Sequence, residues 1–158
     1  MIPADPSVVI AAARSWLGTP YHDQASVKGV GCDCLGLARG VWREVVGPEP
    51  FPIPPYSRDW GESGPREVLA DGARKMMLEL PVADARPGAL LLFRMMPRAI
   101  TKHVGILTVS TSRTAPDCFI HAYERLGVIE QPLTPFWRRR IAFAFLFPGN
   151  GPDHPTPE

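Results

Sequence analysis

The clearest pattern along the chain is an apolar stripe that follows a glycine-containing stretch. Apolar residues recur there at three- and four-residue spacing, at Cys34, Leu37, Ala38, Val41, Trp42 and Val45. This spacing predicts an amphipathic helix from Cys34 to about Val46 with one buried face. Asp33 stands where the N-cap is expected, and Gly47-Pro48 ends the pattern. The stripe therefore places Cys34 in the first turn of a core helix.

Two further helices are predicted in the first half of the chain. One covers residues 7–17 and ends at Gly18. The other runs over residues 65–80, where apolar positions again repeat at helical spacing. Between the helices, residues 48–65 are rich in proline, which predicts an extended surface segment.

After Pro87-Gly88 the apolar pattern changes to that of strands. Short apolar or alternating runs predict five of them, at residues 89–94, 103–109, 118–123, 127–131 and 140–147. Helices first and strands second predict an α+β fold with a mostly antiparallel sheet of about five strands. The length suits one domain, over residues 1–147. The Pro- and Gly-rich residues 148–158 are expected to form a mobile tail.

Composition and charge exclude several classes of protein. The chain is 45% apolar and 21% charged, with a net charge of +1. No broad basic surface is implied, so we expect no nucleic-acid partner. No apolar run has the length of a membrane span. The N-terminus lacks a basic region followed by an apolar core, so we expect synthesis in the cytoplasm without a signal peptide.

The three cysteines offer one candidate nucleophile. Cys32 and Cys34 are too close to pair without strain, and with Cys118 they predict reduced thiols rather than a disulfide framework. Unpaired N–H groups and the helix dipole favour a thiolate at Cys34 and predict a lowered pKa. The alternative is that Cys34 is a small buried apolar side chain.

A thiolate nucleophile needs a base, which is usually histidine. His103 opens one predicted strand, and His121 is central in another. His22 is a competitor in the loop before Cys34, and His154 lies in the tail. The only asparagine is also in the tail, so the group that orients the base must be another polar side chain of the sheet, with His121 as the candidate. Alternatively, His103 and His121 are structural.

Other chemistries lack their motifs. The chain has no phosphate-binding G-x-x-x-x-G-K-[ST], no G-x-G-x-x-G, no G-x-S-x-G and no H-E-x-x-H. A zinc site from Cys32, Cys34 and two histidines would lack the usual spacer between its cysteines. We therefore expect no metal and no cofactor.

Four short blocks occur in a specific order: Leu17-Gly18-Thr19-Pro20-Tyr21, Asp33-Cys34-Leu35-Gly36-Leu37, His103-Val104-Gly105-Ile106 and His121-Ala122. Their order and spacing, over roughly residues 8–147, resemble the NlpC-type family of papain-like cell-wall peptidases. The resemblance is closest to the peptidases encoded among the tail genes of phages and of phage-like gene transfer agents. Those proteins end in a strand similar to residues 137–143.

The resemblance implies a papain-like NlpC-type fold and a role for each matched residue. Cys34 would be the nucleophile, His103 the general base and then the acid, and His121 the group that orients His103. Tyr21 would line the site and help to hold the oxyanion. Asp33 would steady the substrate or the loop.

The resemblance also implies a reaction, and this sequence differs from the family pattern at two positions. The reaction is hydrolysis of peptidoglycan stem peptides, commonly between D-glutamate and diaminopimelate. Leu35 stands where the family usually has Ser, which bears on substrate contacts. Ala89 stands where the family usually has Asp, at the beginning of a predicted strand. The family gives no role to Cys32.

The sequence and the resemblance together lead to the hypothesis of a cysteine endopeptidase that acts as a phage-like tail-tip component. Its expected partners are the peptidoglycan peptide and tail-tip or hub proteins, and its expected place is the particle tail, acting at the cell wall or periplasm. Residues 48–58 and the tail from Pro148 are candidate docking segments. The alternatives are a catalytically silent tail-hub protein and a papain-like acyltransferase.

Overall fold

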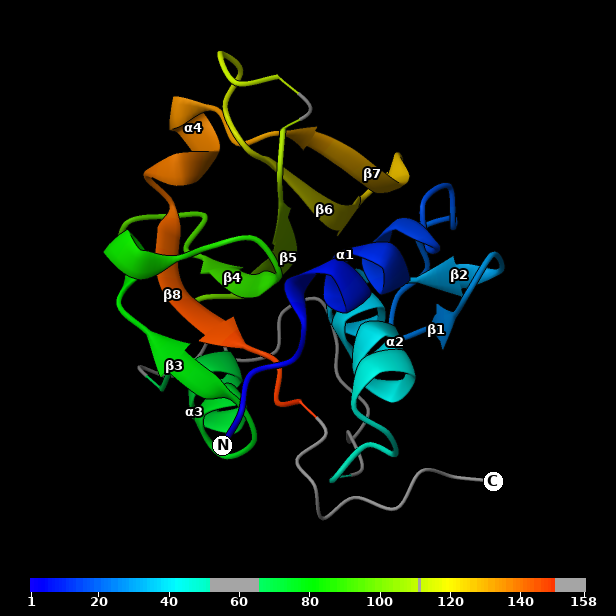
Figure 1. Cartoon of the computed structure of the whole chain (residues 1–158). Coiled ribbons are helices and arrows are strands. Elements are labelled where there is room, and N and C mark those ends of the chain that lie inside the picture. The colour runs from blue at the N-terminus through cyan, green and yellow to red at the C-terminus, as the bar shows by residue number, and fades with distance from the viewer. Residues whose placement is uncertain (52–65, 111, 150–158) are drawn as a thin grey trace.

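A six-stranded antiparallel sheet forms the centre of the fold (Figure 1). The computed structural model describes residues 1–51, 66–110 and 112–149. The strand order is β3-β8-β4-β5-β6-β7. The strands are β3 Leu78–Leu80, β4 Ala89–Phe93, β5 His103–Thr108, β6 Cys118–Tyr123, β7 Gly127–Pro132 and β8 Ile141–Leu146. The expected α+β class with an antiparallel sheet is confirmed.

Helices α1 and α2 pack on each other and against β5 (Figure 1). The helical elements are α1 Pro6–Arg14, α2 Cys34–Val45, α3 Val68–Arg74, the 3₁₀ turn η1 Val82–Asp84, and α4 Pro135–Arg138. A small hairpin, β1 Ser26–Val27 and β2 Gly31–Cys32, precedes α2. Helix α2 also contacts β6 and this hairpin, so it occupies the centre of the helical layer.

The predicted third helix is wrong in its second half. Helix α3 ends at Arg74, and Leu78–Leu80 forms an edge strand instead. Leu78 pairs with Leu146 and Leu80 with Ala144, so the sheet gains a sixth strand. The free edge of β8 supplies backbone partners to these residues, and strand pairing of this kind overrides a local helical pattern.

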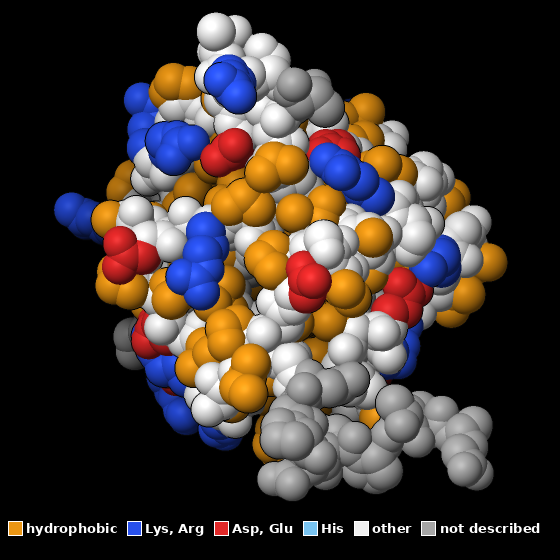
Figure 2. All heavy atoms as spheres, in the orientation of Figure 1, with side chains coloured by type: hydrophobic (Ala, Val, Ile, Leu, Met, Phe, Trp, Pro, Cys, Tyr) orange, Lys and Arg blue, Asp and Glu red, His pale blue; other side chains and the backbone are white. Residues whose placement is uncertain are grey.

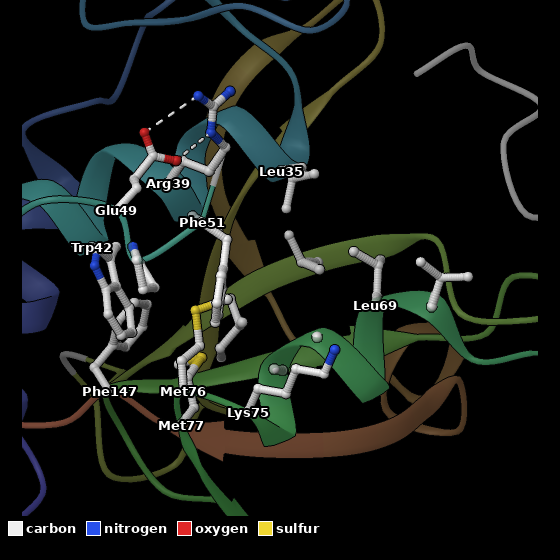
Figure 3. A pocket seen from close by; sticks show the side chains of 17 residues that line it. Leu35, Arg39, Trp42, Glu49, Phe51, Leu69, Lys75, Met76, Met77 and Phe147 are labelled. Atoms are coloured by element: carbon white, nitrogen blue, oxygen red, sulfur yellow. Dashed lines mark hydrogen bonds and ion pairs between the residues drawn. The ribbon is translucent and has the colours of Figure 1, made fainter. Parts of the chain in front are cut away.

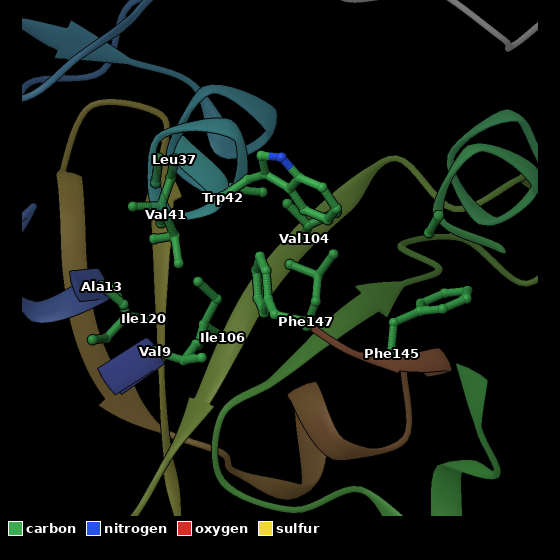
Figure 4. Packing of buried hydrophobic residues seen from close by; sticks show 14 of the residues in the cluster. Val9, Ala13, Leu37, Val41, Trp42, Val104, Ile106, Ile120, Phe145 and Phe147 are labelled. Carbon is green, nitrogen blue, oxygen red and sulfur yellow. The ribbon is translucent and has the colours of Figure 1, made fainter. Parts of the chain in front are cut away.

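Strand β4 is buried on both faces of the sheet, which explains its uninterrupted apolar sequence. Leu90 and Leu92 belong to the core under α1 and α2. Figure 4 shows that core, in which Val41 and Trp42 of α2 lie over Val104, Ile106 and Phe147. Ala89, Leu91 and Phe93 belong to a second core on the opposite face. Phe119 and Trp137 also belong to this second core.

The surface carries mixed charges: basic and acidic side chains are interspersed with apolar ones on the face in Figure 2. Among the described helices, none is long and apolar enough to cross a membrane. Pro148 forms a bridge with Pro3, so pairing continues beyond the predicted domain end at residue 147. The predicted docking residues 52–58 and the tail residues 150–158 lie outside the described residues.

Two glycines of α2 permit close approach by neighbouring segments. A Cβ atom at Gly40 would lie 2.0 Å from Cζ2 of Trp16, whose side chain is 2% exposed. A Cβ atom at Gly36 would lie 1.9 Å from the carbonyl oxygen of Ala25. Helix α2 can therefore seat against Trp16 and against the loop before β1 only with glycine at these two positions.

The substitution Gly40→Ala should destabilise the fold by about 1–3 kcal/mol, because a methyl group there overlaps the indole of Trp16. Gly72→Ala in α3 is the matched control, since a Cβ atom there has no neighbour within 4 Å. The control should be neutral or stabilising by up to about 1 kcal/mol. Denaturant midpoints measure both effects, and equal changes in the two variants would contradict the packing argument.

Candidate active site

The site begins at the buried carboxylate of Asp33, which is 4% exposed. Its Oδ1 accepts the backbone N–H of Gly36 at 2.7 Å, which confirms the predicted N-cap of α2. Its Oδ2 accepts the backbone N–H of Gln24, also at 2.7 Å. One side chain thus joins the loop before β1 to the first turn of α2, where Cys34 lies.

A short backbone ladder places Tyr21 beside this turn. Cys32 donates its N–H to the carbonyl of Pro20 at 3.0 Å, and His22 donates to the carbonyl of Cys32 at 3.0 Å. Tyr21 therefore forms a parallel bridge with Cys32 and packs against the helical core. The exposed ring of His22 interacts with the carbonyl of Asp23 at 3.1 Å and stays within its own loop.

Cys34 is partly buried and rests on the backbone at both sides of His103. Its thiol donates to the carbonyl oxygen of Lys102 with a sulfur–oxygen distance of 3.6 Å. The backbone N–H of Val104 lies near the sulfur and acts to lower the pKa of the thiol. The beginning of α2 and the beginning of β5 therefore meet at the thiol. Among the described contacts, no hydrogen bond joins the thiol to the His103 ring.

His103 and His121 form a direct pair across neighbouring strands. Nε2 of His103 and Nδ1 of His121 are 2.7 Å apart, and the rings are nearly perpendicular. His121 is 0% exposed. Aromatic rings surround the pair, with Trp137 at 5.6 Å from the His103 ring and 5.1 Å from the His121 ring, and Phe119 at 4.3 Å from His121. The structure thus brings the two predicted histidines together and leaves Nδ1 of His103 outside their contact.

Burial keeps both histidines neutral. It lowers the pKa of His103 to about 3, with the nearby His121 adding to the effect. Burial lowers the pKa of His121 to about 4, and the Gln131 side chain opposes this change. Both groups are therefore uncharged imidazoles near pH 7, whereas an exposed histidine would titrate there.

Burial also acts on the thiol, and the expected lowering of its pKa is wrong. Loss of hydration raises the pKa of Cys34 to about 11, and the Asp33 carboxylate raises it further by repelling a thiolate. Nearby backbone N–H groups, led by that of Val104, oppose this but do not outweigh it. At rest the site holds a neutral thiol and a neutral imidazole.

A carboxylate bridge holds the segment before His103. Glu67 accepts the N–H and the hydroxyl of Thr101 at 2.9 and 2.8 Å, and it accepts Nη1 of Arg94 at 2.8 Å. Arg94 also donates to the carbonyl of Ala99 at 2.6 Å. Because Lys102 follows Thr101 directly, this bridge fixes the carbonyl that accepts the Cys34 thiol.

An apolar pocket of about 360 Å³ adjoins the site, between α2 and α3 (Figure 3). Its wall includes Leu35 and Val104, the residues that directly follow Cys34 and His103 in the chain. Trp42 lines another part of the wall. Leu35, which stands where the NlpC-type pattern usually has Ser, therefore lines this pocket, whereas Cys34 and His103 do not.

Sequence reasoning missed three contributors to the site. Trp137 precedes the predicted last strand, and the resemblance places it in a terminal strand, but it lies in α4; the preceding Thr134-Pro135 is the signal of a helix start. Nothing local in the sequence marks Glu67 or Gln131, which act through residues distant in the chain.

In the part of the chain that the structure describes, no group of three His, Cys, Asp or Glu side chains is arranged to hold a metal ion.

Alkylation of Cys34 by iodoacetamide should become about tenfold faster per pH unit between about pH 6 and pH 9. The reason is that the thiolate fraction rises tenfold per unit below a pKa of about 11. Peptide mapping would compare the alkylation rate of Cys34 with the rates of Cys118 and Cys32. Burial raises the pKa of Cys32 to about 12. Earlier labelling of Cys32, or a rate that is constant below pH 7, would contradict the site described.

Comparisons with known proteins rest on structure. No family model matches the sequence, and no curated protein matches it. The NlpC/p60 domain of the peptidoglycan hydrolase SagA superposes with a TM-score of 0.57 at 22% identity, over 89% of this chain and 97% of that one.

Two longer proteins give similar values. An NlpC/P60 family protein from Bacillus cereus has a TM-score of 0.60 at 21% identity, over 90% of this chain. An NLP/P60 family protein from Staphylococcus aureus has 0.58 at 19% identity, over 94% of this chain. This chain spans only 40% and 44% of their lengths, respectively. The chain therefore has the NlpC/p60 fold.

Proposed function

We propose that the protein is a cysteine peptidase that hydrolyses peptidoglycan stem peptides. The observation that carries the proposal is the meeting of Cys34 with the backbone at both sides of His103, whose ring is paired with His121 at 2.7 Å. A thiol at a helix N-terminus, a histidine and a buried orienting group are the parts of a papain-like site. The NlpC/p60 fold, also found in a domain of a peptidoglycan hydrolase, supports this substrate class.

In the proposed reaction, Nδ1 of His103 takes the thiol proton as Cys34 sulfur bonds to the amide carbon. The carbonyl electron pair moves to oxygen, and N–H groups at the start of α2 stabilise that oxyanion. His103 then gives the proton to the leaving amine as the C–N bond breaks. Water attacks the resulting thioester and gives one proton to His103, which returns it to the sulfur as the C–S bond breaks.

The neutral resting site suits this sequence of steps. Proton transfer from Cys34 to His103 is uphill in the free protein because both charged forms are poorly hydrated there. The transfer becomes favourable as negative charge moves from sulfur to the carbonyl oxygen and meets preorganised N–H donors. Tyr21 is proposed to help at this oxyanion. Asp33 is proposed to act by holding the turn.

The proposed scissile bond is the one between D-glutamate and diaminopimelate. The support for it is the resemblance of the Tyr21, Cys34, His103 and His121 blocks to the NlpC-type pattern. Mass spectrometry of muropeptides released from purified sacculi would identify the bond, since each alternative cleavage leaves fragments of different mass.

His103→Ala should lower turnover of a soluble stem peptide by several powers of ten, because it removes the proton acceptor. His121→Ala should cost less, because it removes only the group that orients the acceptor. Cys34→Ala should abolish turnover, and His22→Ala should leave it unchanged as the matched histidine control. Small and equal losses for His103→Ala and His121→Ala would mean that both are structural.

The apolar pocket favours a second candidate function, acyl transfer or hydrolysis of an acyl thioester. The pocket of about 360 Å³ has an apolar lining that includes Leu35 and Val104, the residues next to Cys34 and His103 in the chain, and it has room for an aliphatic chain. Parallel assays with medium-chain acyl esters and with stem peptides would separate the two functions. Faster turnover of the acyl esters, abolished by Cys34→Ala, would replace the peptidase proposal.

We also propose that the protein works as a component of a phage-like tail tip, delivered to the cell wall with the particle. The support is the resemblance to peptidases of phage and gene transfer agent tail genes. Immunogold labelling and mass spectrometry of purified particles should detect the chain at the tail tip. Its absence from particles would refute delivery, and its presence with no turnover of sacculi would favour the silent hub protein.

A further inference from the structure

One nitrogen of the buried His121 ring has no well-formed hydrogen bond in the part of the chain that the structure describes. Nδ1 lies 2.7 Å from Nε2 of His103, whereas Nε2 is buried and forms no hydrogen bond of good geometry with any described residue, although the Gln131 side chain lies near enough to act on the ring. A buried polar atom of this kind is unusual in folded proteins, because leaving it unpaired costs much of its hydration free energy. The side chains around Nε2 therefore indicate which group the histidine pair needs as a hydrogen-bond partner.

The proposed function fixes where the protons lie, and the inference rests on it. Nδ1 of His103 must be free of hydrogen to accept the Cys34 proton. Neutral His103 then carries its hydrogen on Nε2 and donates it to Nδ1 of His121. Neutral His121 must in turn carry its hydrogen on Nε2. Nε2 of His121 is thus an N–H donor, and the site needs an acceptor beside it.

The register of the sheet brings one suitable acceptor to that position. Phe119 of β6 pairs with Gln131 of β7, and His121 pairs with Ile129. Alternate residues of a strand share a face, so Gln131 is the diagonal neighbour of His121 on the same face. Gln131 is partly buried and acts to raise the pKa of His121, which is the effect of a carbonyl oxygen that faces the ring.

The remaining neighbours of His121 do not offer this acceptor. Phe119, Trp137 and Tyr123 contact the His121 ring through their own rings, and His103 occupies Nδ1. Glu130 points to the opposite face of β7, where it binds Arg14 and the hydroxyl of Thr108. Among these groups His103 and Tyr123 are the titratable ones that face His121.

We propose that Gln131 is a positioning residue whose side-chain carbonyl accepts the Nε2–H of His121. The bond holds His121 in the tautomer that accepts from His103, and thereby keeps Nδ1 of His103 free for the Cys34 proton. A neutral amide suits this position, because a carboxylate would attract a second proton to His121 and remove its acceptor nitrogen.

The test uses the full chain with ¹⁵N-labelled histidine, and the variants Gln131→Leu and Gln131→Glu. Imidazole nitrogen shifts report the tautomer and the pKa of His121 without any substrate. The wild type should show the Nε2–H tautomer, Gln131→Leu a mixture of tautomers, and Gln131→Glu a His121 pKa raised by about one unit or more. Glu130→Gln is the matched control on the same strand and should leave the His121 signals unchanged.

Turnover of stem peptide gives the second readout. Gln131→Leu should lower kcat by about tenfold with little change in KM, because it misorients the base without touching the substrate. A wild-type Nδ1–H tautomer, or unaltered signals and kcat in Gln131→Leu, would overturn the proposal. If Gln131→Leu does not fold, Gln131→Glu decides alone through the His121 pKa. If the histidine signals are as expected but neither the wild type nor any variant turns over stem peptide, the peptidase proposal is refuted and the positioning role of Gln131 stands.

Discussion

The buried carboxylate of Asp33 is the constraint on which the site depends. It accepts two backbone N–H groups, from Gln24 and Gly36, and both bonds are 2.7 Å long. Loss of the carboxylate would leave two N–H donors unpaired in a nearly closed space. The same group repels a thiolate at Cys34 and so raises its pKa. The same carboxylate therefore fixes the position of the turn that holds Cys34 and lowers the reactivity of its thiol at rest.

The two sides of the site are held by different means. Cys34 is fixed locally, by a cap and a short ladder within residues 20–36. His103 is fixed by long-range contacts, through the sheet, the His121 pair and the Glu67 bridge to Thr101. A hydrogen bond from the thiol to the Lys102 carbonyl joins the two sides. The geometry of the site thus depends on how α2 packs on the sheet, and Gly40 lets α2 approach Trp16, which follows α1.

This difference explains what the sequence could predict. The cap at Asp33 and the helix over residues 34–45 follow from local spacing, and the five strands follow from apolar runs. The strand Leu78–Leu80 could not be predicted, because its state is decided by the free edge of β8. The raised pKa of Cys34 also escaped prediction, because it arises from burial under distant segments rather than from the helix terminus. Bridges such as the one from Glu67 have no local signature.

The aromatic surroundings of the histidine pair complete the physical argument. Trp137 contacts both rings although it lies in α4, late in the chain. By excluding water, these rings lower the pKa of both histidines and keep them neutral. When both rings are neutral, one ring nitrogen of the pair donates and the other accepts. The position of the proton on one ring therefore determines its position on the other. Under the proposed function, proton transfer at Cys34 therefore depends on the amide of Gln131 on β7, and so on the pairing of β6 with β7.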